Sequence, residues 1–129
     1  MNTKNVMIGS AAFMAAIGLT LSFLPDEILT FFQAGNNPVA VIACQLLGAT
    51  YLGLAMLNGM SKGITIGGIY NKPIAVGNFM HFAVGVMALM KIQSKMEINK
   101  EVFVVLTIIY AVFALLYGYI FRTHPMLKN

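Results

Sequence analysis

Four long stretches of this chain are almost entirely apolar, and short polar segments separate them. The stretches cover residues 6–24, 38–60, 73–92 and 102–121. Each matches the roughly 20 helical residues that cross the ~30 Å hydrocarbon core of a bilayer. They contain no Asp, Glu or Arg, and their one lysine, Lys91, lies at the end of the third stretch. Because the apolar residues run on without the alternation of a barrel strand, the pattern predicts four transmembrane helices.

The segment between the first two stretches predicts a short additional helix over residues 25–35. Pro25 would take its first position, Asp26 and Glu27 would lie in its first turn, and Gly35 would end it. Asn37 is then expected to cap the second span. The large apolar side chains of the short helix are expected to lie along the membrane interface; they are Ile28, Leu29, Phe31 and Phe32.

Composition supports a membrane protein. Hydrophobic residues make up 59% of the chain and charged residues 9%, with a mean hydropathy of +0.82, whereas about 25% of the residues in a soluble domain are charged. This balance excludes a soluble enzyme, a disordered chain and a nucleic-acid binder. The expected fold is one all-α domain over residues 1–129: an integral membrane bundle of four antiparallel transmembrane helices with a short interfacial helix after the first span.

The basic residues predict an orientation. Four spans place both termini on one side, which carries five basic residues: Lys4, Lys62, Lys72, Arg122 and Lys128. The other side carries three, which are Lys91, Lys95 and Lys100, together with all four acidic residues. The excess of Lys and Arg favours cytoplasmic termini. Because the margin is narrow, insertion in both orientations remains an alternative.

Small residues indicate where the helices can approach one another closely, since packing in membranes relies on close contact and polar bonds. The first stretch carries a stripe of small residues at a spacing of three or four: Ala11, Ala15, Gly18 and Ser22. The second carries the pair Ala49 and Gly53, extended by Gly48, Ala55 and Gly59. In the third, Gly77 and Gly85 flank His81 on one face.

Polar side chains inside the apolar stretches are few, and such residues are functional hypotheses by default. At a rise of 1.5 Å per residue, several share one depth in the half of the membrane nearer the termini. With two residues of the adjoining loop, they form the predicted ligand-binding set: Asn58, Tyr70, Lys72, Asn78, His81 and Tyr117. A second polar level, nearer the other side, comprises Gln45, Thr107 and Tyr110.

Two interpretations of these polar residues stay open. They could bind a lipid-like or quinone-like ligand, with His81 as a proton carrier or hydrogen-bond donor. They could instead form interhelical hydrogen bonds, which contribute about 0.6–2 kcal/mol each. The adjoining loop carries Lys62, Lys72 and two consecutive glycines beside a helix N-terminus, a combination that could hold an anionic head group. We predict no catalytic residue, metal site or cofactor; a bis-histidine haem would need a second intramembrane histidine.

Three motifs in the central part of the chain support a family resemblance. They are GATYLGLAMLN over residues 48–58, IGGIYNKP over 66–73 and GNFMHF over 77–82. On these motifs the chain resembles a family of uncharacterised small bacterial membrane proteins with four spans. The resemblance covers most of the chain and is sharpest between residues 45 and 82. It implies a bacterial cytoplasmic membrane location and carries no activity.

The sequence therefore leaves three functions open. The first is a non-enzymatic membrane protein that binds a lipid-like or quinone-like molecule, or a membrane-protein partner, through its cytoplasmic half. The second is a small transporter or channel built as a homo-oligomer, suggested by the small-residue faces and the narrow charge margin. The third is a membrane enzyme that uses His81 in acid–base chemistry, although no second ionisable group accompanies the histidine.

Overall fold

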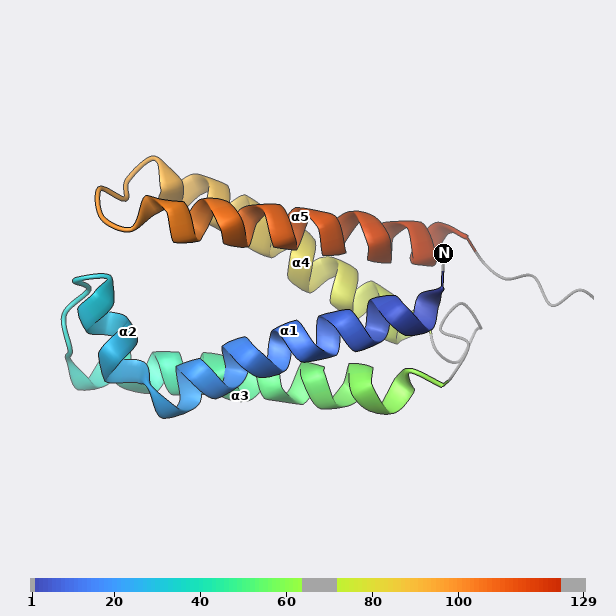
Figure 1. Ribbon diagram of the computed structural model, residues 1–129, viewed down its shortest axis with the longest axis horizontal. Coiled ribbons are helices and arrows are strands. Elements are labelled where there is room, and N and C mark those ends of the chain that lie inside the picture. Colours follow the sequence, from blue (N-terminus) through green and yellow to red (C-terminus); the bar gives the residue numbers. More distant parts are fainter. Residues whose placement is uncertain (1, 64–71, 124–129) are drawn as a thin grey trace, which may run out of the picture. The chain divides into compact units, whose positions relative to one another are not determined.

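The described residues of this computed structural model, 2–63 and 72–123, form helices joined by short connections (Figure 1). The helices are α1 (Thr3–Phe23), α2 (Pro25–Phe31), α3 (Pro38–Ser61), α4 (Lys72–Gln93) and α5 (Lys100–Arg122). Among the described residues, α1, α3, α4 and α5 are long and apolar enough to cross a membrane. The predicted all-α fold with four spans and a short helix after the first is confirmed.

The spanning helices are slightly longer than the apolar stretches that predicted them. The first begins at Thr3 rather than residue 6, and the fourth begins at Lys100 rather than residue 102. The fourth also continues to Arg122. Helical hydrogen bonding extends into these polar flanks because it depends on the backbone, whereas the prediction followed hydrophobicity. With 21 to 24 residues each, the helices are about 31–36 Å long.

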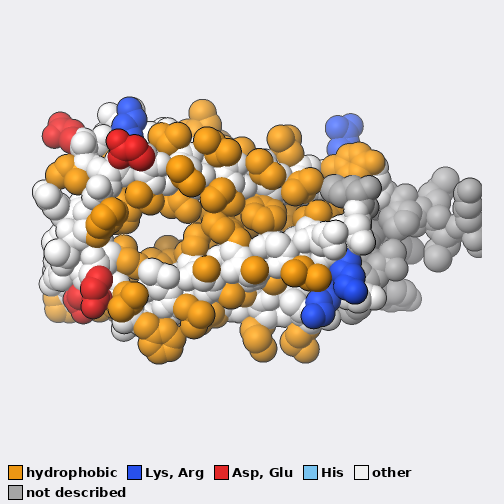
Figure 2. All heavy atoms as spheres, viewed as in Figure 1, with side chains coloured by type: hydrophobic (Ala, Val, Ile, Leu, Met, Phe, Trp, Pro, Cys, Tyr) orange, Lys and Arg blue, Asp and Glu red, His pale blue; other side chains and the backbone are white. Residues whose placement is uncertain are grey.

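Large apolar side chains cover the sides of these helices. Val39, Met60, Met87 and Leu115 are each more than 70% exposed. In Figure 2, hydrophobic side chains follow the length of the helices, while charged side chains gather near the helix ends. Contiguous apolar surface of this extent is typical of contact with lipid rather than water. The four helices therefore fit a multi-pass membrane protein.

The chain divides into two units, which are described separately. One comprises Met7–Lys62 and holds most of α1 with α2 and α3; the other comprises Gly63–Asn129, together with Met1–Val6, and holds α4 and α5. In the first unit, α1 and α3 are antiparallel and closest at two glycines. A Cβ atom on Gly18 would lie 3.0 Å from the carbonyl oxygen of Gly48, and one on Gly48 would lie 2.8 Å from the backbone nitrogen of Ser22.

This contact corrects the predicted packing face of the second span. The sequence predicted a surface built on the pair Ala49 and Gly53 and extended by Gly48, Ala55 and Gly59, but a Cβ atom on Gly53 would meet nothing within 4 Å. The face that contacts α1 instead includes Gly48 and Leu52, and Gly59 lies near Ala11. Several small residues are spread around α3, and spacing alone did not identify which of them face the neighbouring helix.

The connection from α1 to α3 is held by local hydrogen bonds. The Asn37 side chain accepts a bond from the Ala40 backbone nitrogen at 2.9 Å, which confirms the predicted cap of α3. Asn36 Nδ2 lies 3.3 Å from the Asp26 carbonyl oxygen. The short helix ends at Phe31 rather than near Gly35, because the chain already adopts a left-handed conformation at Gln33, where φ is +52°.

One prediction about the short helix is wrong. Leu29, expected to lie along the membrane interface, is buried, with 7% of its surface exposed. Leu29 lies one turn after the buried Pro25, on the opposite side of this two-turn helix from the exposed Glu27 and Phe31. The helix α2 contacts α3, so α2 carries an inward face as well as an exposed one.

In the second unit, α4 and α5 form an antiparallel hairpin. Near the connecting loop, Gln93 Nε2 donates to the Phe103 carbonyl oxygen at 3.2 Å and also bonds Thr107 Oγ1. Further along, Gly118 of α5 faces the ring of Phe79 on α4. A Cβ atom on Gly118 would lie 3.2 Å from this ring. The hairpin is therefore in contact along most of its length, from the loop to the far end of α5.

Replacing Gly48 with alanine should weaken the α1–α3 contact. The new Cβ would meet backbone atoms of α1, which cannot rotate away, and overpacking of this kind costs about 1–3 kcal/mol. The measurement is the thermal unfolding midpoint of the purified protein in mild detergent. Gly53→Ala is the matched control, since its Cβ meets nothing within 4 Å and alanine favours the helix. Equal midpoints for the two variants would contradict the packing described.

Candidate functional site

The predicted ligand-binding residues belong to both units. Asn58 lies on α3, whereas Lys72, Asn78 and His81 lie on α4 and Tyr117 lies on α5. Tyr70 lies outside the described residues. The surroundings of each residue are therefore given within its own unit, beginning with Asn58.

Asn58 joins α3 to α1. Its Nδ2 donates to Ser10 Oγ at 3.1 Å and lies 3.7 Å from the sulfur of Met14. Ser10 Oγ in turn donates to the Met7 carbonyl oxygen at 3.1 Å. The side chains of Asn58 and Ser10 are fully buried. This is the interhelical hydrogen bonding that the sequence left open as an alternative to ligand binding, and Ser10 is a participant that sequence reasoning missed.

Replacing Asn58 with leucine should destabilise the α1–α3 pair by about 0.6–2 kcal/mol, the range for a hydrogen bond between membrane helices. Leucine has the same number of side-chain heavy atoms and the same branching as asparagine but cannot donate to Ser10. Thermal unfolding in mild detergent measures the change. Gln45→Leu is the control on the same helix, because Gln45 is exposed. Equal stability of Asn58→Leu and the unaltered protein would remove the assigned role of this bond.

Asn78 makes a bond within its own helix. Its Nδ2 donates to the Ile74 carbonyl oxygen at 2.9 Å, four residues earlier, and the side chain is fully buried. This bond satisfies a polar donor inside an apolar helix at the position where the sequence predicted a ligand contact.

His81 and Tyr117 belong to an aromatic cluster between α4 and α5. Phe82, which is fully buried, lies at its centre. Its ring centroid is 4.9 Å from that of Phe113, 5.2 Å from that of Tyr110 and 5.9 Å from that of Tyr117. The His81 ring lies 5.7 Å from the Tyr110 ring. Aromatic pairs at these separations contribute about 0.5–1.5 kcal/mol beyond the area they bury.

The aromatic cluster corrects the predicted division into two polar levels. Tyr110 was placed with Gln45 and Thr107, but its ring packs against His81. Thr107 instead bonds Gln93, and the Gln45 side chain is exposed. Depth along each helix was counted from backbone positions, and this count does not include the reach of the Tyr110 ring, which packs at Gly85, one helical turn from His81.

Close packing beside this cluster depends on Gly85. The Tyr110 ring occupies the position that a Cβ atom on Gly85 would take. Gly77, which the sequence placed on the same face, has nothing within 4 Å of such an atom and lies away from the contact. Only one of the two glycines predicted to flank His81 therefore faces α5.

Replacing Gly85 with alanine should displace the Tyr110 ring and lower stability by about 1–3 kcal/mol. Since the chain contains no tryptophan, the near-ultraviolet circular dichroism comes from tyrosine and phenylalanine and should change as the ring moves. Gly77→Ala is the matched control and should leave both the spectrum and the melting temperature nearly unchanged. A normal tyrosine signal in Gly85→Ala would argue against this arrangement.

The hairpin also carries an apolar groove near the end of α5, with a volume of about 720 Å³. We call it the Arg122 groove. It is lined by one residue of α4 and by the last turns of α5 with the residue that follows: Phe79, Ala114, Leu115, Gly118, Tyr119, Phe121, Arg122 and Thr123. Glycine and alanine leave the space open, and aromatic rings form its walls. Sequence reasoning missed this groove because its lining is mostly apolar.

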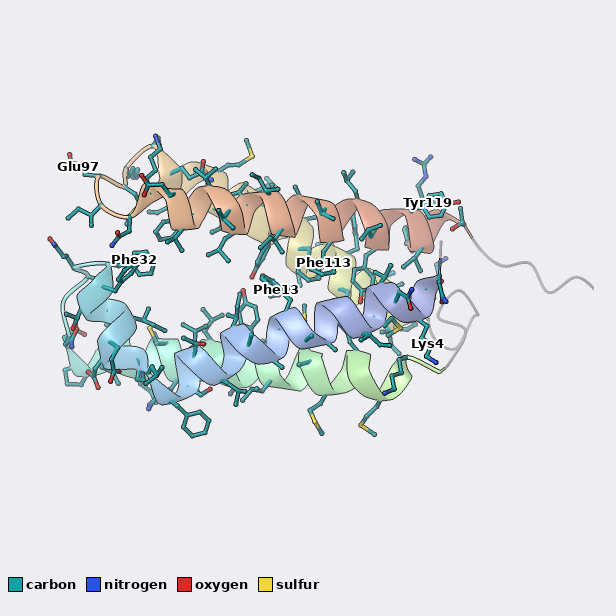
Figure 3. All side chains as sticks on the ribbon, in the orientation of Figure 1. Lys4, Phe13, Phe32, Glu97, Phe113 and Tyr119 are labelled. Atoms are coloured by element: carbon teal, nitrogen blue, oxygen red, sulfur yellow. The ribbon has the colours of Figure 1, made fainter. Side chains whose placement is uncertain are left out.

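Two basic residues accompany the Arg122 groove. Arg122 forms part of the lining and is exposed. Lys72, at the start of α4, places its Nζ 5.1 Å from the centre of the Phe121 ring, within the range of a cation–π contact. In Figure 3, Tyr119 lies near the end of α5 beside the groove, and Glu97 lies in the loop at the opposite end of the hairpin. The groove thus combines an apolar lining with positive charge at one end of the hairpin.

Comparison with known proteins found no family model, no curated protein and no solved structure that matches this chain.

Proposed function

We propose that this chain is a small non-enzymatic membrane protein that binds a lipid-like amphiphile in the Arg122 groove. The observation that carries the proposal is the groove itself, an apolar space of about 720 Å³ with basic residues at one end. Sites for small molecules are mostly apolar, measure about 300–1,000 Å³ and carry a few polar groups that orient the ligand. An acyl or prenyl chain in the groove with a polar head beside Arg122 satisfies this description.

The proposal uses only part of the site predicted from sequence. Lys72 belongs to it, but Asn78 bonds its own helix and Asn58 bonds Ser10. His81 and Tyr117 pack in the aromatic cluster, where they support the hairpin that forms the groove. The homo-oligomeric transporter or channel and the enzyme using His81 stay predictions from the sequence.

We infer that the groove opens toward the cytoplasmic side of a bacterial cytoplasmic membrane. Lys72 and Arg122 belong to the side with the larger number of basic residues, which the positive-inside rule assigns to the cytoplasm. The resemblance to small four-span bacterial membrane proteins supports the choice of membrane. The same orientation places both termini in the cytoplasm.

Filling the groove tests the proposal. Ala114 lines the groove, so Ala114→Phe should displace the apolar chain of a bound amphiphile. Each buried CH₂ group contributes about 0.8 kcal/mol, so excluding two of them should reduce retention at least about tenfold. The measurement is native mass spectrometry of the protein released from its own membrane with mild detergent, which records the lipid-sized mass that each variant retains.

The control for this experiment is Ile108→Phe, which adds the same ring on an exposed part of α5 outside the groove lining. Thermal unfolding confirms that both variants are folded. Loss of the bound mass in Ala114→Phe alone supports the proposal. Equal retention in the two variants, or a bare protein in every sample including the unaltered one, would overturn it.

A further inference from the structure

The two cations beside the groove indicate which kind of amphiphile it holds. We propose that Lys72 and Arg122 form a headgroup site that selects an anionic phospholipid, whose acyl chain lies in the Arg122 groove. This inference rests on the proposed function and adds the chemical class of the ligand. Three observations support it: the position of the cations, the position of the acidic residues and the length of the groove.

Both cations lie at the same end of the hairpin and are associated with groove residues. Arg122 lines the groove directly, and Lys72 Nζ lies over Phe121, which also lines it. A guanidinium group can bind a phosphate with two parallel hydrogen bonds, and an ammonium group supplies a second point charge. Lys72 also begins α4, where the positive end of the helix dipole favours an anion.

The acids of this part of the chain lie at the other end of the hairpin. After residue 62 the sequence contains two acidic residues, Glu97 and Glu101. Glu101 precedes Arg122 by 21 residues of α5, which corresponds to roughly 30 Å. Figure 2 shows acidic side chains gathered near the start of α5, away from its basic end. Positive charge beside the groove is therefore not balanced within the hairpin sequence, and an anionic head group would balance it.

The length of the groove fits one leaflet of a bilayer. Its α5 lining extends from Ala114 to Arg122, which is about 12 Å along the helix axis. One leaflet contributes about 15 Å, half of the hydrocarbon thickness. An acyl chain that begins beside Arg122 at the membrane surface can thus remain in contact with the groove over most of its depth. A phospholipid places its phosphate and its acyl chain at the two positions that the site provides.

A neutral amphiphile, such as a quinone, could use the apolar groove but would leave the positive charge of Lys72 and Arg122 without a counter-charge. The test must therefore measure charge preference at the groove rather than binding alone. It must also separate the groove from the rest of the lipid-facing surface, where every membrane protein contacts phospholipids.

A tryptophan introduced at the groove provides this measurement, since the chain has no native tryptophan. Tyr119→Trp is a conservative reporter in the groove lining, and Ile108→Trp is the control reporter on an exposed part of α5 outside it. Each protein is reconstituted into phosphatidylcholine bilayers that contain increasing fractions of phosphatidylglycerol with brominated acyl chains. Bromine quenches tryptophan on contact, and brominated phosphatidylcholine gives the neutral reference. The ratio of the two quenching curves gives the preference for the anionic lipid at each position.

The Tyr119→Trp reporter should show at least about a fivefold preference for phosphatidylglycerol, which is the contribution of one cation near a membrane surface. The preference should fall to about one when Lys72→Gln and Arg122→Gln are added. Charge-preserving Lys72→Arg and Arg122→Lys should retain most of it and show that the loss is not caused by misfolding. The Ile108→Trp reporter should show no preference.

Equal preference at the two reporters, or a preference unchanged by the two glutamine substitutions, would overturn this inference. The two proposals fail in different ways. Lipid retention that is lost in Ala114→Phe but shows no charge preference would leave the proposed function intact and exclude the anionic headgroup site. Retention that Ala114→Phe does not affect would remove the groove as a ligand site altogether.

Discussion

Helices in a bilayer are surrounded by lipid tails that are as apolar as their own side chains, so burial alone does not bring them together. In this protein, association depends on removing side-chain bulk at particular positions. Gly18 and Gly48 bring the α1 and α3 backbones into contact, and Gly85 admits the Tyr110 ring between α4 and α5. The Asn58–Ser10 bond and the ring contacts of Phe82 likewise need a short distance between the helices that they join.

The two units add different side-chain contacts to this close packing at glycines. The first unit adds a buried hydrogen bond, from Asn58 to Ser10. The second adds stacked rings centred on Phe82 and a polar contact near its loop, between Gln93 and Thr107. The Arg122 groove lies near the end of α5, next to Phe79 and Gly118.

Hydrophobicity and capping residues predicted the fold well, because the length of a span and the cap at Asn37 are local properties. The candidate site was harder to predict because it depends on helix rotation and offset. Counting residues placed Tyr110 and His81 at different depths, but the Tyr110 ring packs at Gly85, one helical turn from His81, and lies 5.7 Å from the His81 ring. Polar residues inside apolar helices pointed to Asn58 and Asn78, whose side chains bond other parts of the protein. The groove is built from glycine, alanine and aromatic residues, which give no polar signal.

The pairing of Ser10 with Asn58 and of Gln93 with Thr107 has a consequence for biogenesis. Each contact joins residues of a single helical hairpin, so it forms within a segment that leaves the ribosome as one piece. The N-terminal hairpin can insert and lock its helices while the C-terminal half is still being translated. Local contacts of this kind favour rapid assembly, and domains generally fold in the order of their synthesis. The polar groups of Ser10 and Asn58 would then be satisfied soon after they enter the membrane, before the insertion machinery has received the second pair of spans.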